Sequence, residues 1–150
     1  MNGFLLDTNV ISMLSPSRDE ASGAFLNWLE QTDNEGKLFL SVVSIHELEK
    51  GIALLEHKGA NAKAADLKIW LNGLTSSYED KIFSLDASVA AIAGQLEAKA
   101  ISAGYNPGMA DAIIAGIAKA NDLHLVTCNK RHLSLFGIIV FSPDEVSLSF

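Results

Sequence analysis

The sequence has only one cysteine, Cys128, three prolines and no long run of apolar residues. A single thiol cannot form an internal disulfide, which agrees with a reducing compartment. No segment approaches the roughly eighteen apolar residues that span a bilayer, and no basic region leads into a long apolar stretch near the N-terminus. We therefore expect a cytoplasmic protein with no membrane segment.

Positive charge is also scarce, because 11 lysines and arginines stand against 18 aspartates and glutamates, for a net charge of −7. This balance excludes a protein that binds nucleic acid over its whole surface, which needs many cations near phosphates. A small nucleic-acid site needs only local positive charge or a bound cation. The 150 residues, 49% of them hydrophobic, predict one globular domain over residues 1–150.

Short apolar segments alternate with longer segments of helical periodicity. The expected strands are residues 3–6, 38–42, 82–85, 124–127 and 138–141. The clearest helix covers residues 86–103, with Asp86 as its N-cap. The alternation predicts an α/β fold, a three-layer α/β/α sandwich with a mostly parallel central sheet.

Three acids occupy similar positions in this pattern. Asp7 follows the first strand and would also serve as an N-cap for a helix starting near Asn9. Glu47 stands three residues after Ser44, a spacing that would also form a capping box. Asp111 lies in the first turn of a helix, where the helix dipole stabilises a carboxylate.

The local explanations do not account for the shared position of Asp7, Glu47 and Asp111 at one edge of the predicted sheet. Ligands bind beyond the carboxyl ends of the strands in such folds. Carboxylates gathered there repel one another unless a cation offsets their charge. Because all the candidate ligands are oxygen donors, the pattern favours Mg²⁺ or Mn²⁺ over zinc or copper.

Four segments, "LLDTNVIS", "SVVSIHELEKG", "MADAIIAGIAKAND" and "LVTCN", together resemble the PIN-domain ribonucleases. The resemblance covers nearly the whole chain and is to the toxins of bacterial VapBC and FitAB toxin–antitoxin pairs. It implies that Asp7, Glu47 and Asp111 form the catalytic metal site. It also implies that Thr8 and Asn9 are hydrogen-bonding neighbours of Asp7; Thr127 is expected to orient the end of its strand.

The fourth segment departs from the family pattern. Many members have an arginine after the threonine and a further acid directly after it or three positions later, whereas this chain has Cys128, Asn129 and His132 at these places. Asn129 offers a carbonyl oxygen but no negative charge. We therefore expect one well-held metal ion and slower chemistry, with Asn129 as a fourth catalytic residue.

The candidate RNA contacts are cations near these motifs. Lys130, Arg131 and His132 follow the fourth segment, and Lys50 lies one helical turn from Glu47. Each also has a simpler interpretation as a solvated surface residue.

The resemblance implies a metal-dependent endoribonuclease that cleaves RNA with a metal-activated water, leaving a 5′-phosphate and a 3′-hydroxyl. It also implies a cognate antitoxin, which lays a helix or extended segment into a groove, and a homodimer. Leu14, Phe25 and Leu29 are candidates for lining that groove or for the core.

Two alternatives remain open from the sequence. A nuclease-like binding scaffold would explain the missing fourth acid. A phosphatase of the haloacid-dehalogenase type begins with a similar strand and Asp-x-Asp motif, but here Asn9 replaces the second aspartate.

Overall fold

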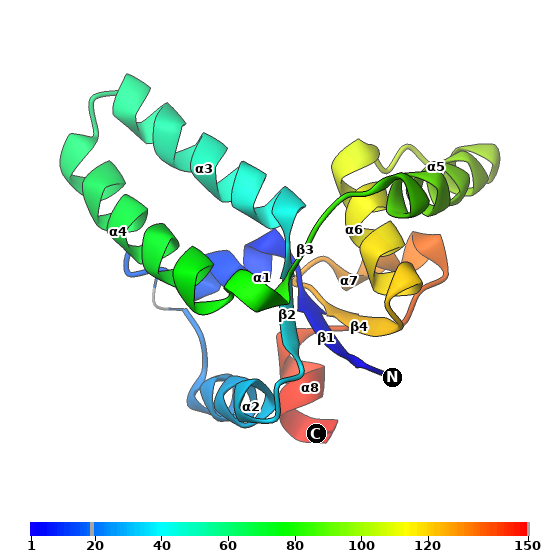
Figure 1. Cartoon of the computed structure of the whole chain (residues 1–150), viewed down its shortest axis with the longest axis horizontal. Coiled ribbons are helices and arrows are strands. Elements are labelled where there is room, and N and C mark those ends of the chain that lie inside the picture. Colours follow the sequence, from blue (N-terminus) through cyan, green and yellow to red (C-terminus); the bar gives the residue numbers. More distant parts are fainter. Residues whose placement is uncertain (19, 150) are drawn as a thin grey trace.

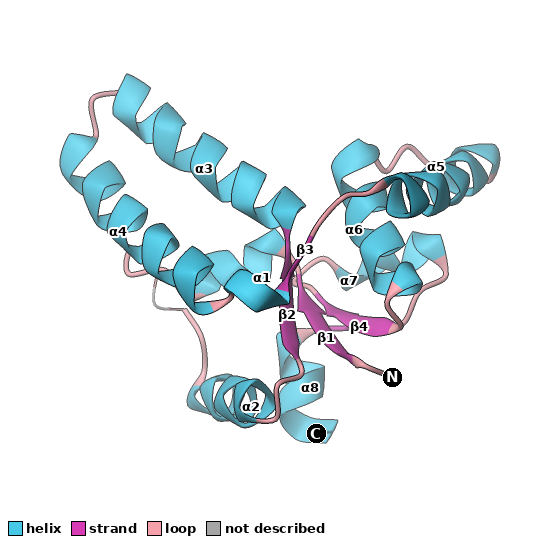
Figure 2. Cartoon of the chain, in the orientation of Figure 1, coloured by secondary structure: helices cyan, strands magenta, loops and turns pink. Residues whose placement is uncertain are grey.

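The computed structural model describes residues 1–18 and 20–149, which fold around a five-stranded sheet (Figures 1 and 2). The strands are β1 (Gly3–Leu6), β2 (Leu38–Ser41), β3 (Ile82–Phe83), β4 (Leu123–Val126) and β5 (Val140–Phe141). Their order is β3-β2-β1-β4-β5, and every neighbouring pair is parallel. The predicted parallel α/β fold is confirmed, with β1 at the centre of the sheet.

The strand bounds differ from the predicted ones by up to two residues. Val42 belongs to a helix because Ser41, the last residue of β2, already caps that helix. β4 begins and ends one residue earlier than predicted, while β3 and β5 keep only two residues each. Both short strands lie at the edges of the sheet, where each pairs with a single neighbour.

Helices connect the strands and cover the sheet. They are α1 (Thr8–Met13), α2 (Gly23–Asn34), α3 (Val42–His57), α4 (Asn61–Ser77), α5 (Ala87–Ser102), α6 (Met109–Ala120), α7 (Lys130–Leu133) and α8 (Pro143–Ser149), with 3-10 turns η1 (Glu79–Lys81) and η2 (Ser134–Phe136). The predicted cap at Asp86 is confirmed, because its Oδ1 accepts a hydrogen bond of 2.9 Å from the Val89 amide. No helix within residues 1–18 and 20–149 is long and apolar enough to cross a membrane.

The two faces of the sheet have separate cores, since alternate residues of a strand point to opposite sides. Leu5 packs with α5 and α6 on one face, whereas Phe4 and Leu6 pack with α1, α2 and α8 on the other. The rings of Phe4 and Trp28 meet edge to face with centroids 4.9 Å apart. Figure 1 shows these two layers of helices on opposite sides of the strands.

Helices α3 and α4 form a hairpin that projects from the sheet (Figure 1). The hairpin has its own small apolar cluster, in which Ile52, Ala64 and Leu71 are buried. Because α3 begins directly at the end of β2, its first turns lie at the carboxyl edge of the sheet. The hairpin therefore forms one wall of any site at this edge.

Candidate functional site

An open cleft of about 280 Å³ lies at the carboxyl edge of the sheet, and we call it the acidic cleft. Its lining residues are Asp7, Thr8, Asn9, Ser12, Arg18, Glu47, Asp111, Asn129 and Leu133. All three predicted acids are among them, although they come from three distant parts of the chain. The structure thus brings Asp7, Glu47 and Asp111 to one cavity.

Asp7 follows β1 directly and caps α1, so its predicted capping role and its position in the cleft coexist. Its Oδ1 accepts from the Thr8 amide at 2.8 Å, and its Oδ2 accepts from the Thr127 hydroxyl at 2.7 Å. Burial raises the pKa of the Asp7 carboxyl, and the negative charges of Asp111 and Glu47 add to the rise, although both hydrogen bonds oppose it. The ionised form of Asp7 is therefore destabilised in the folded protein, and a cation in the cleft would reduce this destabilisation.

Asn9 links the first and fourth predicted motifs. Its Nδ2 donates to Asp7 Oδ2 at 3.3 Å and to Thr127 Oγ1 at 3.4 Å, while its Oδ1 accepts from the Cys128 amide at 3.0 Å. The side chain is thus held by partners on both sides. Cys128 is exposed at the edge of the site, with its Sγ 3.3 Å from Met13 Sδ.

Glu47 lies in the second turn of α3, and the predicted capping box at Ser44 is wrong. Ser41 caps α3 instead, because its Oγ accepts from the Ser44 amide at 3.3 Å. The Glu47 carboxylate accepts from the Thr8 hydroxyl at 2.7 Å rather than from a backbone amide. The sequence pattern missed this because β2 ends one residue earlier than its apolar run suggests.

Buried serines orient the Thr8 hydroxyl. Thr8 has a single hydroxyl proton, which it donates to Glu47, so Ser44 is the donor in the 2.9 Å contact between Ser44 Oγ and Thr8 Oγ1. Ser41 in turn donates to Ser44 at 3.5 Å. Ser41 and Ser44 are both fully buried, so this chain of hydroxyls fixes where Glu47 is held.

Asp111 lies in the first turn of α6, after Gly108 at a φ of 89°, which favours glycine. Its Oδ2 lies 2.9 Å from His132 Nε2, so His132 is a half-buried partner of an acid and not a freely solvated residue. Burial raises the pKa of Asp111 and the charge of Glu47 adds to this, although His132 opposes the rise.

The other predicted contacts divide between the cleft and the surface. Asn129 lines the cleft, and its amide donates to Thr127 Oγ1 at 3.0 Å. Lys130 forms a salt bridge with Glu145, with its Nζ 2.7 Å from a carboxylate oxygen, and so does not line the cleft. Lys50 and Arg131 are exposed and are not among the residues that line the acidic cleft.

Sequence reasoning missed Arg18 and Ser12, which both line the acidic cleft. Ser12 lies on α1, one turn beyond Thr8. Arg18 follows α1 in the turn-forming stretch Ser15-Pro16-Ser17, which carries no periodic signal. The isolated positive charge beside three acids becomes visible only once the chain is folded.

The donors of the acidic cleft suit a hard divalent cation, because they are carboxylate and amide oxygens. The raised pKa values of Asp7 and Asp111 point the same way, since both carboxylates lack a full counter-charge. Within the described parts of the chain, however, no three His, Cys, Asp or Glu side chains already form a group that could hold an ion. In this arrangement Glu47 accepts a hydrogen bond from Thr8, and Asp111 lies beside His132.

The parallel sheet and the carboxylates at its carboxyl edge define an α/β protein with an acidic cleft at the expected ligand-binding position. The PIN domain family model matches residues 4–136, and the chain belongs to this family. Proteins of this family are generally nucleases that use divalent metal ions.

Relatives of known name match over most of the chain. Plasmid stability protein StbB of Pseudomonas syringae pv. tomato is 33% identical over 142 residues, which are 94% of this chain and 98% of the relative. Toxin FitB of Neisseria gonorrhoeae is 31% identical over 140 residues, 93% of this chain and 96% of the relative. The crystal structure of FitAcB from the same organism superposes with a TM-score of 0.79 at 31% identity, covering 93% of this chain and 97% of that one. The comparisons lend no support to a phosphatase.

Proposed function

We propose that this protein is a metal-dependent endoribonuclease that acts as the toxin of a toxin–antitoxin pair. The observation that carries the proposal is the meeting of Asp7, Glu47 and Asp111 in one cleft, with the pKa of Asp7 raised by burial and by the other two charges. Membership of the PIN domain family and the similarity to Toxin FitB support it further.

In this proposal Asp7 and Asp111 would hold Mg²⁺ or Mn²⁺, with Glu47 in the same cleft. When bound, such an ion would lower the pKa of a bound water and stabilise negative charge on the scissile phosphate. The chain's own task is to place the acids: Thr127 holds Asp7, and Thr8 holds Glu47. The expected products carry a 5′-phosphate and a 3′-hydroxyl.

Asn129 takes the place where many relatives have a fourth acid, and it supplies no negative charge. Arg18 adds a positive charge to the same cleft, which weakens the electrostatic attraction for a second cation. We therefore expect a single ion per active site and modest turnover. The missing fourth acid also favours a second candidate, a PIN-fold scaffold without turnover. Titration calorimetry should detect no Mn²⁺ binding to such a scaffold.

The direct test is to incubate purified protein with single-stranded and structured RNA in Mg²⁺, Mn²⁺ or EDTA. Cleavage should require the ion and should disappear in Asp7→Asn and in Asp111→Asn. Circular dichroism checks that both variants remain folded. Metal-dependent cleavage that persists in both variants would defeat the assignment of the site.

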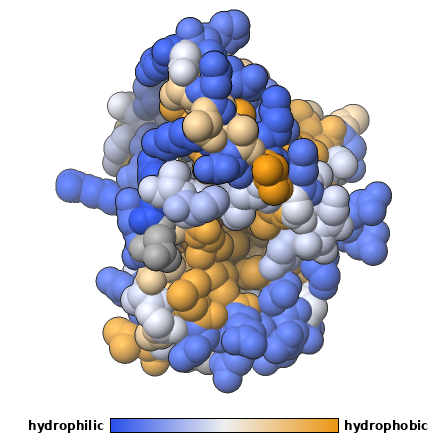
Figure 3. All heavy atoms as spheres, turned by 90° about the vertical axis from the view of Figure 1, so that its left-hand side faces the viewer, coloured by the Kyte–Doolittle hydropathy of each residue, from blue (hydrophilic) through white to orange (hydrophobic). Residues whose placement is uncertain are grey.

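An apolar groove suits the antitoxin that the toxin role requires. Apolar side chains gather in a hollow on the face shown in Figure 3. The groove lies between α1, α2, β2 and the end of α4, and it is lined by Leu6, Ile11, Leu14, Leu29, Glu30, Asp33, Leu38, Leu40, Leu74 and Tyr78. Leu14 and Leu29 are among its lining residues, although Leu29 also belongs to the buried core, whereas Phe25 is 1% exposed and lies in the core alone.

We propose that an amphipathic segment of the antitoxin lies in this apolar groove, with basic residues toward Glu30 and Asp33 at its polar lining. Leu14→Asp should then weaken the complex with the protein encoded beside this one, while RNA cleavage by the free protein stays intact. We place the protein in the cytoplasm, where its RNA substrate is found, and expect a homodimer. Sedimentation of the purified chain tests the oligomeric state.

A further inference from the structure

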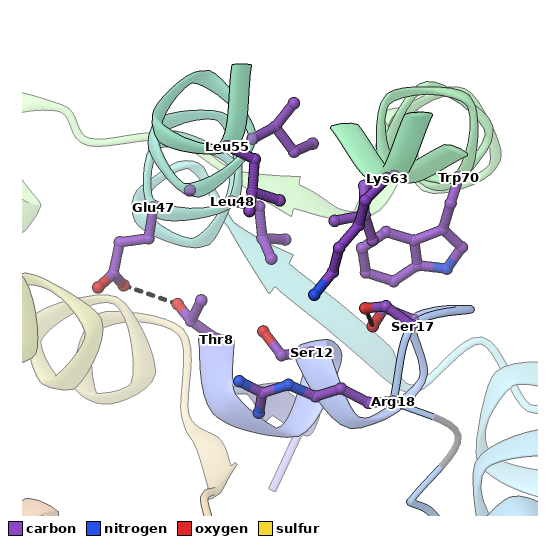
Figure 4. A pocket seen from close by; sticks show the side chains of 13 residues that line it. Thr8, Ser12, Ser17, Arg18, Glu47, Leu48, Leu55, Lys63 and Trp70 are labelled. Atoms are coloured by element: carbon purple, nitrogen blue, oxygen red, sulfur yellow. Dashed lines mark hydrogen bonds between the residues drawn. The ribbon is translucent and has the colours of Figure 1, made fainter. Parts of the chain in front are cut away.

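A second groove, of about 240 Å³, adjoins the acidic cleft, and Figure 4 shows the side chains that line it. We call it the side groove, and its lining residues are Thr8, Ser12, Ser15, Ser17, Arg18, Glu47, Leu48, Gly51, Ile52, Leu55, Lys63, Leu67 and Trp70. Thr8, Ser12, Arg18 and Glu47 line both cavities. The two cavities therefore lie next to each other and share these walls.

Two cations point into the side groove from opposite walls. Arg18 reaches in from the segment after α1, and Lys63 reaches in from the first turn of α4 (Figure 4). Among the described residues neither forms a salt bridge, whereas Lys68 on the same helix is paired with Glu56 at 3.4 Å. The groove is thus lined by two cations with no salt bridge to any described residue, in a chain with a net charge of −7.

The same groove presents an aromatic ring. Trp70 lines the wall formed by α4 together with the aliphatic side chains of Leu48, Leu55 and Leu67, and it is only partly buried where it packs against the core. The other tryptophan, Trp28, is 4% exposed in the core. The serines at positions 12, 15 and 17 supply hydroxyl donors along the opposite wall.

We infer that the side groove binds the single-stranded RNA next to the scissile phosphate, with Arg18 and Lys63 on successive phosphates and a base against Trp70. Cations along the backbone and an aromatic surface for unpaired bases are the combination that single-stranded nucleic acid needs. The inference rests on the proposed function, because it takes the acidic cleft as the place of cleavage. It assigns substrate binding to Arg18 and Lys63 instead of Lys50, Lys130 and Arg131.

Charge separates this groove from the apolar groove. The apolar groove is lined by Glu30 and Asp33 and contains no lysine or arginine among its lining residues. In the side groove the cations Arg18 and Lys63 outnumber the single acid, Glu47, so we expect its occupant to be an anion. A single strand fits better than a duplex, because stacking on Trp70 needs an unpaired base.

The first test measures cleavage of an unstructured RNA oligonucleotide in Mn²⁺ at several salt concentrations. Lys63→Gln should raise KM about 3- to 10-fold with little change in kcat, and should reduce the slope of log affinity against log salt by about 0.7. Lys68→Gln, on the same helix but paired with Glu56, is the matched control and should leave KM unchanged. Equal KM values for Lys63→Gln and Lys68→Gln would overturn the inference.

The second test needs no turnover and uses tryptophan fluorescence in EDTA. Binding of the same oligonucleotide should quench Trp70 while the buried Trp28 contributes a constant background. Trp70→Leu, which keeps an apolar side chain in the hairpin, should remove the quench and weaken RNA binding at least about 5-fold. Urea unfolding confirms that Trp70→Leu remains folded, and a quench that survives in this variant contradicts the inference.

Together the two tests separate failure of the side groove from failure of the proposed function. RNA that quenches Trp70 but is never cleaved supports the side groove and argues against the nuclease. Cleavage with unchanged KM in Lys63→Gln supports the nuclease and argues against the side groove. If Lys63→Gln keeps full RNA affinity but loses affinity for the antitoxin, the groove is a protein site and the inference is wrong.

Discussion

The hydroxyl of Thr127 donates a hydrogen bond of 2.7 Å to Oδ2 of Asp7, and both side chains are buried. Leu6 and Val126 are paired in the parallel register of β1 and β4, so the next residue of each strand reaches the same edge of the sheet. The Thr127 hydroxyl also accepts from the Asn129 amide at 3.0 Å. One side chain thus connects the first acid to the segment that carries the fourth motif.

Replacement of Thr127 by valine keeps the shape of the side chain and removes this hydroxyl. We expect the free energy of unfolding to fall by about 1–3 kcal/mol, because a buried carboxylate loses a donor and the Asn129 amide loses an acceptor. Urea unfolding measures the change. Thr127→Ser keeps the hydroxyl and serves as the control, so an equal loss in both variants would show that packing matters and the hydrogen bond does not.

Thr8→Val tests the hydrogen bond that holds Glu47. Loss of the Thr8 hydroxyl frees the Glu47 carboxylate and leaves Ser44 without its acceptor. We expect kcat to fall by about 10-fold or more, because a misplaced catalytic group commonly costs this much. Thr8→Ser should retain most of the activity in the same RNA cleavage assay, and a Thr8→Val enzyme with normal kcat would rule out the positioning role.

The architecture was predictable because the apolar strands and amphipathic helices alternate along the whole chain, and parallel pairing follows from that alternation. Asp7 and Asp111 could be placed for the same reason, since each lies directly at the start of a helix. The position of Glu47 was predicted, but its partner was not. Thr8 is 39 residues away, and no local spacing reports a contact of that kind.

The surface cations were the least predictable part of the site. Lys130 lies next to the fourth motif in sequence, but the fold turns it toward Glu145 on α8. Lys63 lies far from every motif, and the α3–α4 hairpin returns it to the groove beside Glu47. Proximity in sequence favours Lys130 as an RNA contact, whereas proximity in space favours Lys63. The choice between them becomes clear only once the α3–α4 hairpin is folded.

In the proposed metal site, His132 would compete with the ion for Asp111. Its Nε2 lies 2.9 Å from Asp111 Oδ2, and both side chains are about one-third exposed, at 33% and 30%. We expect His132→Phe to tighten Mn²⁺ binding about 2- to 10-fold, because the hydrogen bond to Asp111 no longer has to be broken. Titration calorimetry measures the affinity, with Arg131→Gln as the neighbouring control. Weaker binding in His132→Phe would instead make the histidine a support for the site.

The same ion should stabilise the fold through mass action. At a Mn²⁺ concentration about 100 times its Kd, the free energy of unfolding rises by about 2.7 kcal/mol for one site. For a chain of this size the thermal midpoint should rise by about 5–10 °C. Asp7→Asn should abolish most of this rise in differential scanning fluorimetry. An equal rise in Asp7→Asn would place the ion elsewhere.

We expect His124, which does not line the acidic cleft, to make stability depend on pH. Its Nδ1 is buried without a hydrogen-bond partner among the described residues, and its ring lies between Phe4 and Phe141. Burial lowers the pKa of His124 below 6.5, and the positive N-terminus adds to this, although Asp122 opposes it. The folded state therefore binds the proton less readily than the unfolded state.

The resulting stability is fully present above the unfolded pKa of about 6.5 and is lost as the pH falls below it toward the folded value. Urea unfolding of the wild type between about pH 7 and 5 should show this decline. His124→Leu should flatten it over the same range, and the difference between the two proteins removes the contribution of the carboxylates. Parallel curves for both proteins would exclude His124 as the cause.

The packing of α5 against α6 depends on a glycine, and a second glycine nearby provides the comparison. A Cβ built on Gly116 would lie 3.0 Å from the Ala93 Cβ and 3.1 Å from its backbone nitrogen, so the helices must separate. In Gly116→Ala the overpacking should destabilise the fold by about 1–3 kcal/mol. The better helix propensity of alanine offsets about 1 kcal/mol of this, so the net change should still be destabilising. Gly94→Ala on α5 has no atom within 4 Å of the added carbon and should stabilise by about 0.5–1 kcal/mol in the same urea experiment. Opposite signs for the two variants would confirm that contact between the helices decides the effect, whereas two stabilising changes would show that α5 and α6 tolerate a wider spacing.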